Sequence, residues 1–130
     1  MVVDTSVLVE SLTGLRRLYP MLRRVLDSGQ KLQIPSIVLY EWWRGPRTEP
    51  ELAIQEILLP RESAVPFGAE EAVLAARLYK QVRRARSREM DLAIAACAMV
   101  REIPLWTLNR DDFKDIPGLM LAKPDYTRDV

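Results

Sequence analysis

The sequence contains no histidine and a single cysteine, Cys97, in 130 residues. Without histidine the chain cannot build a Ser-His-Asp triad, use imidazole as an acid or base, or form most zinc sites. One cysteine excludes an intramolecular disulfide framework and a cysteine metal cluster. A metal bound by this chain must therefore take oxygen ligands, which magnesium and manganese prefer.

Long hydrophobic runs are also missing. No apolar stretch approaches the roughly 20 residues that cross a bilayer. The first residues, Met1 to Asp4, lack the basic region and apolar core of a signal peptide. We therefore expect a soluble, cytoplasmic protein with no membrane partner, and one free thiol agrees with a reducing compartment.

Lysine is scarce, because arginine supplies 15 of the 19 basic residues, although the net charge is only +1. The planar arginine side chain can bind a phosphate through two hydrogen bonds, which favours a nucleic-acid partner. A solvated surface explains the same composition equally well.

Short apolar segments alternate with helical patterns along the chain. This alternation predicts right-handed crossovers and a three-layer α/β/α fold with a central, mainly parallel sheet of four or five strands. A chain of this length, with 48% hydrophobic residues, favours one domain over residues 1–130. The expected strands are 1–3, 31–34, 64–67, 103–108 and 119–121, and the expected helices are 15–28, 36–43, 50–59, 69–86 and 89–101.

Two aspartates stand where these elements begin or end. Asp4 follows the first strand, and ligands of parallel sheets bind at such carboxyl ends. Asp4 could equally cap the next helix. Asp91 opens a nearly continuous apolar helix, where an unpaired carboxylate is costly and a metal ion would relieve that cost. Interaction with the helix dipole is the alternative for Asp91.

Further acids follow the same pattern. Glu41 lies within the apolar helix 36–43, where it could instead pair with Arg44. Polar residues 107–112 follow the fourth strand, and a turn explains them equally well. Clustered carboxylates repel one another unless a divalent cation lies among them. Such a cation lowers the pKa of bound water and stabilises charge on phosphate, which predicts metal-assisted phosphodiester hydrolysis.

In order and over nearly the whole chain, these segments resemble the motifs of the PIN-domain ribonucleases, in particular the small VapC-type toxins of toxin–antitoxin pairs. The fourth segment resembles the pattern Thr-x-Asn-x-x-Asp/Glu-Phe, whose phase favours Asp112 over Asp111. Residues 87–90 depart from the family by being more charged. The matching segments are residues 2–10 with Asp4, 34–45 with Glu41, 91–96 with Asp91, and 107–113 with Asp112.

The resemblance implies a single PIN-like nuclease domain, a Mg²⁺- or Mn²⁺-dependent endoribonuclease. It also implies a VapB-like antitoxin as a partner and a homodimer. Asp4 and Asp91 would be the principal metal ligands, Glu41 would bind a second metal or position the attacking water, and Asp112 would complete the acidic cluster. The residues implied to orient these carboxylates are Thr5, Ser6, Thr107 and Asn109.

Basic residues precede Asp91 at helical spacing. On the predicted helix 69–86 and just beyond it they share one face, which predicts a track for the RNA backbone or, alternatively, a solvated face. The four residues are Arg77, Lys80, Arg84 and Arg88. Around Glu41, Tyr40, Trp42 and Trp43 favour packing in the core or against a partner over stacking on RNA bases.

Two alternatives from other classes remain. A phosphoacceptor receiver domain has the same size and sheet, and Lys123-Pro124 resembles its Lys-Pro. A receiver also needs an acceptor aspartate after the third strand, and here Gly68 follows that strand. The second alternative is a catalytically inert binding module that keeps the PIN fold.

Overall fold

A short parallel sheet forms the centre of the molecule. The computed structural model describes residues 1–124. Strands β1 (Val2–Val3) and β2 (Leu105–Trp106) pair in parallel. Single parallel bridges extend this pairing on both sides, so five extended segments lie in the order 65, 33–35, β1, β2 and 121, which confirms the predicted parallel sheet. The bridges join Val2 to Gln33, Pro35 to Val65, and Leu105 to Leu121.

Prolines lie in or beside several of the short extended segments. Pro35, Pro66 and Pro104 lie within or beside the extended segments, and proline has no amide proton to donate to a ladder. The backbone hydrogen bonds that remain still join the segments, as from the Val65 amide to the Ile34 carbonyl at 2.8 Å.

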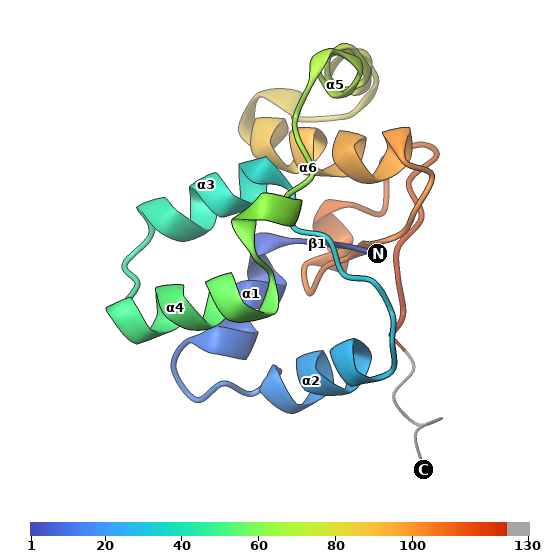
Figure 1. Ribbon diagram of the computed structural model, residues 1–130. Helices are drawn as coiled ribbons and strands as arrows, with labels where there is room; N and C mark the ends of the chain where they lie inside the picture. The colour runs from blue at the N-terminus through green and yellow to red at the C-terminus, as the bar shows by residue number, and fades with distance from the viewer. Residues whose placement is uncertain (125–130) are drawn as a thin grey trace.

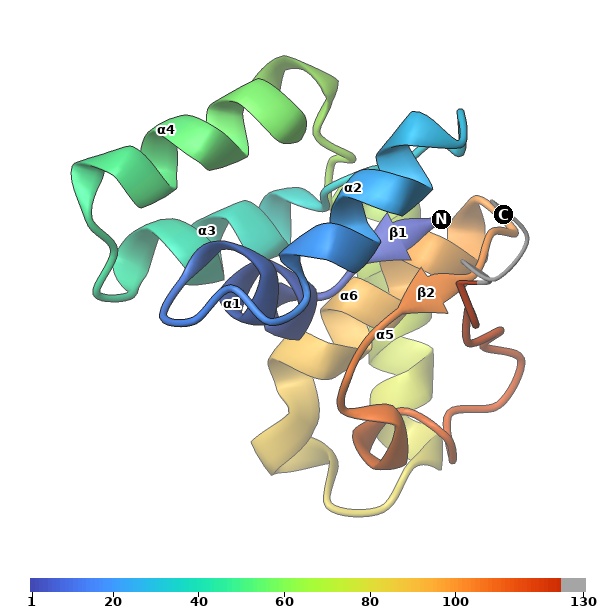
Figure 2. The same cartoon turned by 90° about the horizontal axis from the view of Figure 1, so that it is seen from below.

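Helices cover both faces of this sheet. Figure 1 shows α5 and α6 above β1 and α2 below it, and Figure 2, seen from below, shows α2 in front of β1 and α6 behind it. Residues 92–98 of α6 are all buried, as expected for a helix between the sheet and α5. Within residues 1–124, no helix combines the length and apolarity needed to cross a membrane. The helices are α1 (Thr5–Leu12), α2 (Tyr19–Asp27), α3 (Ser36–Arg44), α4 (Glu49–Leu58), α5 (Ala69–Gln81) and α6 (Glu89–Val100).

The predicted helix 15–28 is wrong in its first turn. Residues 15–18 form a loop, and a separate helix, α1, precedes it. Gly14 and Arg16 both have positive φ, +59° and +52°, which ends α1 and starts a tight turn. The amide of Leu18 then donates to the carbonyl of Glu10 at 3.1 Å, which folds the loop back onto α1.

The predicted helix 69–86 is wrong after residue 81. The chain becomes extended at Val82 and left-handed at Arg84, with φ +54°. Val82 and Ala85 both pack against the core, so burial of these two side chains accompanies the break. Two 3-10 helices near the site complete the described chain, η2 (Ala85–Arg88) and η3 (Arg110–Asp112), and a third, η1 (Arg61–Ser63), follows α4.

The single-domain prediction for residues 1–130 stays a prediction, and its last six residues lie outside the described part.

Candidate active site

Asp4 occupies the junction between β1 and α1. Asp4 is only 4% exposed to solvent. Although Asp4 stands at the N-cap position of α1, its side chain makes no capping hydrogen bond. Instead, Oδ2 accepts hydrogen bonds from Thr107 Oγ1 at 2.7 Å and Ser6 Oγ at 2.8 Å. The helix-cap alternative therefore does not describe the contacts of this carboxylate.

Parallel pairing brings Thr107 to Asp4. The amide of Asp4 donates to the carbonyl of Trp106 at 2.9 Å, so the residues that leave β1 and β2 stand at one edge of the sheet. The Thr107 hydroxyl accepts a hydrogen bond from the Asn109 amide at 3.0 Å, and the Ser6 hydroxyl accepts one from the Leu108 amide at 3.1 Å. Each hydroxyl thus accepts from the backbone and donates to Asp4, as a group that orients a carboxylate should.

Glu41 reaches the same region from α3. Thr5 Oγ1 donates to Glu41 Oε1 at 2.6 Å, so the residue after Asp4 holds the second acid. The alternative ion pair of Glu41 with Arg44 is also present, because Arg44 Nη2 lies 3.8 Å from Glu41 Oε2. The Arg44 side chain is 54% exposed, and a contact of this length at the surface contributes little.

Asp91 lies in the first turn of α6 and is partly buried. Burial, the largest cause, and the negative charges of Asp4, Asp112 and Glu41 together raise the pKa of this carboxyl to about 6, while the positive charge of Arg88 opposes them. Acids from four separate segments therefore lie close enough to repel one another. A bound cation would remove that repulsion.

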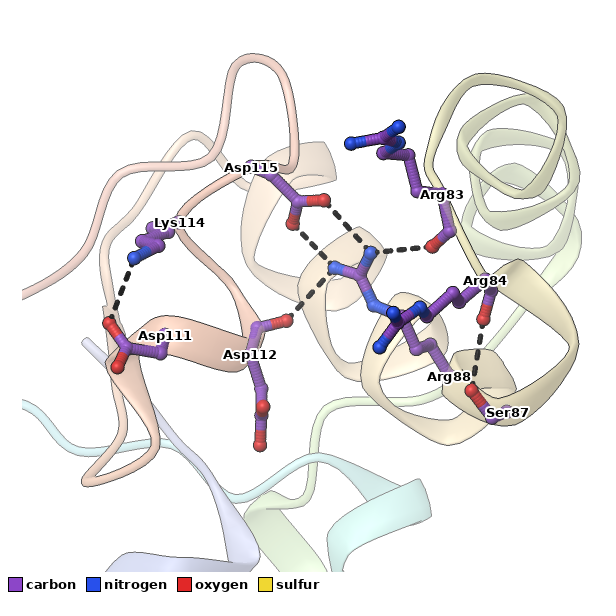
Figure 3. A network of polar contacts seen from close by, with 8 residues as sticks. All are labelled: Arg83, Arg84, Ser87, Arg88, Asp111, Asp112, Lys114 and Asp115. Carbon is purple, nitrogen blue, oxygen red and sulfur yellow. Dashed lines mark hydrogen bonds and ion pairs between the residues drawn. The ribbon is translucent and has the colours of Figure 1, made fainter.

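The two adjacent aspartates of η3 point to different places. Asp111 pairs with Lys114 at 3.2 Å, and both side chains are exposed. In Figure 3 the Asp111 side chain turns to Lys114, whereas that of Asp112 points away from this pair. Asp112 is the one whose charge acts on Asp91. The role of Asp112 as the fourth acid, which the motif phase favours, stays a prediction.

An open cleft of about 530 Å³ contains most of these groups. Asp112 is outside its lining, although its charge reaches Asp91. Arg17 is the basic residue of the cleft wall. The cluster of Arg16, Arg17, Arg23 and Arg24 is the sequence signal for it, but its place in the cleft depends on the turn at Gly14 and Arg16. The predicted residues that line the cleft are Asp4, Thr5, Ser6, Glu41, Asp91 and Asn109, and the lining residues that were not predicted are Val9, Glu10, Arg17, Leu18 and Leu108.

The sequence matches the model of the PIN-domain family over residues 1–119. The chain belongs to the PIN-domain family. PIN domains are generally nucleases that use divalent metal ions, which supports a hydrolase acting on nucleic acid and leaves the receiver-domain alternative without support. No curated protein sequence matches this PIN domain.

Two crystal structures share its fold. One is the structure of VapBC2 from Rickettsia felis bound to a DNA fragment from their promoter, with a TM-score of 0.71 and 24% identity over 95% of this chain and 98% of the other. The second is DNA-bound VapBC from Salmonella typhimurium, with a TM-score of 0.71 and 22% identity over 93% and 95% of the two chains. At such identities the likeness establishes the fold alone.

The acids of this PIN domain fit a hard divalent cation by their chemistry. Among the described residues, no three acidic or thiol side chains are placed as ligands of one ion. Magnesium commonly binds through one or two carboxylates and keeps several waters, so two acids suffice. Both hydrogen bonds to Asp4 use Oδ2, which leaves Oδ1 for a cation, and Asp91 gains most from one because three acids oppose its charge.

The predicted basic face of the PIN domain is wrong as a single helix face. Arg77 and Lys80 lie on α5, but the helix ends before the other two residues. Arg84 occupies a left-handed turn, and Arg88 belongs to η2. The Arg88 side chain is only 15% exposed and pairs with Asp115 at 2.6 Å. Whether each of these residues binds RNA stays a prediction.

The aromatic residues around Glu41 divide into two groups. Trp42 is fully buried in the core. Tyr40 and Trp43 are 57% and 43% exposed, and they line a groove with Leu39 and Arg61. Core packing therefore accounts for one aromatic side chain, and the other two form an apolar surface beside α3.

Proposed function

We propose that this PIN domain is an endoribonuclease that uses Mg²⁺ or Mn²⁺ and is the toxin of a toxin–antitoxin pair. The observation that carries the proposal is the convergence of Asp4, Glu41, Asp91 and Asp112, in which burial and the three other acids together raise the pKa of Asp91 to about 6. The choice of RNA rests on the resemblance of the four acidic motifs to PIN-domain ribonucleases.

The chain's own residues would perform distinct tasks. Asp4 Oδ1 and Asp91 would hold the cation, while Thr107 and Ser6 keep the Asp4 carboxylate fixed through Oδ2. When bound, the cation supplies water of lowered pKa and neutralises charge on the phosphate. Glu41, fixed through Oε1 by Thr5, would present Oε2 to orient the attacking water.

Arg17 would receive the RNA. It lies in the cleft wall with Asp4, Glu41 and Asp91, so a phosphate beside the scissile one could bind there. This arrangement would balance the negative charge of the acids for an anionic substrate.

The decisive experiment is a cleavage assay on a panel of structured RNAs. We expect cleavage with Mg²⁺ or Mn²⁺, loss of cleavage in excess chelator, and loss of cleavage in Asp4→Asn with an unchanged circular dichroism spectrum. Asp111→Asn is the matched control, because Asp111 is exposed and pairs with Lys114, and it should cleave at the normal rate. Full activity in excess chelator contradicts metal dependence. Metal and RNA binding without cleavage would favour the inert-module alternative.

The proposed partners are an antitoxin and a second copy of the chain. The two similar structures are VapBC complexes, and the groove of Leu39, Tyr40, Trp43 and Arg61 is an apolar surface suited to an antitoxin segment. Co-purification with the product of an adjacent small gene, and sedimentation of the chain alone, would test both. A strict monomer at micromolar concentration that retains no partner contradicts this part of the proposal. The cytoplasmic location stays a prediction.

A further inference from the structure

A single guanidinium joins the segments that carry two of the four acids. Arg88 Nη1 donates to Asp115 Oδ2 and to the carbonyl of Arg83, each at 2.9 Å. Arg88 Nη2 donates to Asp115 Oδ1 at 2.6 Å and to the carbonyl of Asp112 at 2.9 Å. Figure 3 shows this guanidinium between η2 and the turn that contains Asp112 and Asp115.

The position of Arg88 gives these contacts a consequence for the cleft. Arg88 ends η2, and Asp91 follows three residues later in the first turn of α6. The carbonyl that Arg88 binds belongs to Asp112 itself. The Asp112 side chain points away from the guanidinium, so Arg88 holds the backbone of that residue and leaves its carboxylate free.

We propose that Arg88 is a positioning residue, which fixes the turn of Asp112 against the start of α6 so that the Asp112 carboxylate faces Asp91. The inference rests on the proposed function, because it assigns Arg88 a role in building that site. It also gives a role to Arg88 within the charged segment 87–90, where the chain departs from the pattern of its family.

The contacts of Arg88 compete with phosphate binding by its guanidinium. All four N–H groups of its two terminal nitrogens donate to protein oxygens, and its side chain is 15% exposed. An RNA phosphate would have to displace Asp115 from a two-bond pair, which is the strongest geometry that an arginine and a carboxylate can adopt.

Lysine cannot reproduce this arrangement, because an ammonium has three donors and no planar fork. Arg88→Lys therefore keeps the charge and removes the geometry. Asp115→Asn keeps Arg88 and weakens the pair from the other side. Arg86→Lys is the matched control for the first change, because Arg86 is an exposed residue of the same 3-10 helix. Asp111→Asn controls for the charge lost in the second.

The first measurement is amide hydrogen exchange of the turn. The amides of Asp112, Phe113 and Lys114 donate to carbonyls within the turn, at 2.9 to 3.1 Å. Arg88→Lys and Asp115→Asn should speed exchange at these three amides, and the controls should not. Unchanged exchange overturns the inference.

The second measurement is the Mn²⁺ dissociation constant, by electron paramagnetic resonance, in two backgrounds. We expect Arg88→Lys to weaken Mn²⁺ binding about tenfold in the native background, as loss of an orienting partner commonly does. In the Asp112→Asn background the same change should add nothing, because the carboxylate that Arg88 positions is absent. Equal weakening in both backgrounds, or none in either, overturns the inference.

The experiments distinguish failure of the positioning role from failure of the proposed nuclease function. RNA cleavage by the native chain without the Mn²⁺ pattern keeps the nuclease and rejects the positioning role. The Mn²⁺ pattern without RNA cleavage keeps the positioning role and rejects the nuclease. A native chain that binds no Mn²⁺ rejects both.

Discussion

The acidic cleft and the basic segment from residue 77 to 88 differ in how their charged side chains are arranged in space. The acids of the cleft come from segments far apart in the chain and converge on Asp91, whose pKa burial and these charges together raise to about 6. The basic residues are neighbours in the chain, yet they spread over α5, a left-handed turn and η2. Arg88 alone is withdrawn from solvent, and it binds carbonyls and a carboxylate.

The contrast shows what brings charges together in this fold. Hydrogen bonds between the parallel strands β1 and β2 fix the edge of the sheet where Asp4 and Thr107 meet, so the pairing of the strands is enough to bring these two residues together. A helical face lasts only as long as the helix. The α5 helix ends at Gln81, and beyond that residue helical spacing no longer places the arginines on one helix face.

The largest expected effect is on the acidic side of this comparison. Asp91→Asn should lower kcat for RNA cleavage by at least about 10³-fold, because a metal contributes several kcal/mol of charge stabilisation. Single-turnover cleavage of one RNA substrate, with Mg²⁺ in excess, measures the loss. Activity within tenfold of the native rate would move the metal site away from Asp91.

A smaller effect should follow from the hydroxyls that hold Asp4. Thr107→Val removes the 2.7 Å hydrogen bond to Oδ2 and should lower kcat about 10- to 100-fold. Thr107→Ser should restore most of the rate. Thr48→Val is the control, since it removes a capping hydroxyl of α4 and lowers stability without touching the cleft. An equal loss of kcat in that variant would assign the effect to stability.

The raised pKa of Asp91, caused by burial and by the neighbouring acids, predicts that replacing this carboxyl stabilises the protein in a pH-dependent way. Native Asp91 binds its proton below about pH 6, and unfolded Asp91 below about pH 4, so rising pH between these values lowers the free energy of unfolding. Asp91→Asn should therefore stabilise the metal-free protein by about 2 kcal/mol at pH 7, allowing for screening at a half-buried group, and by almost nothing at pH 3.5.

Urea unfolding in chelator at the two pH values measures this difference. The competing proton also predicts that Mn²⁺ affinity of the native chain falls as pH drops below about 6. If Asp91→Asn instead lowers the free energy of unfolding at neutral pH, the ionised Asp91 carboxylate does not destabilise the folded protein, and this prediction is wrong.

The smallest effect concerns the cations. Arg17→Ala should weaken RNA binding several-fold and flatten the log–log salt dependence by roughly 0.7 to 0.9, as loss of one phosphate contact does. Arg77→Ala and Lys80→Ala, on the face of α5, are matched comparisons. Binding in Ca²⁺, which slows cleavage, measures all three over several salt concentrations. A flatter slope in the α5 variants alone would restore the predicted backbone track and remove Arg17 from it.

Much of the fold could be predicted because, in most segments, the spacing of hydrophobic residues agrees with the prolines and glycines that begin or end the elements. The apolar helix 89–101 appears as Glu89–Val100, and the helix after Pro35 appears as Ser36–Arg44. The helix α1 was missed. The two wrong helix boundaries lie where positive φ occurs, at Arg16 and Arg84, which are arginines that carry no turn signal in the sequence. Such conformations depend on packing around the turn, as with Val82 and Ala85.

The sequence by itself determined the chemistry of the site. Without histidine, and with acids placed at the ends of strands and at the start of an apolar helix, carboxylates were the available ligands. Only the tertiary structure decided which aspartate of η3 acts on Asp91, and that Arg17 rather than the α5 cations lines the cleft. Those outcomes depend on contacts between distant segments, such as Arg88 with Asp115, and the spacing of residues within one segment does not encode them.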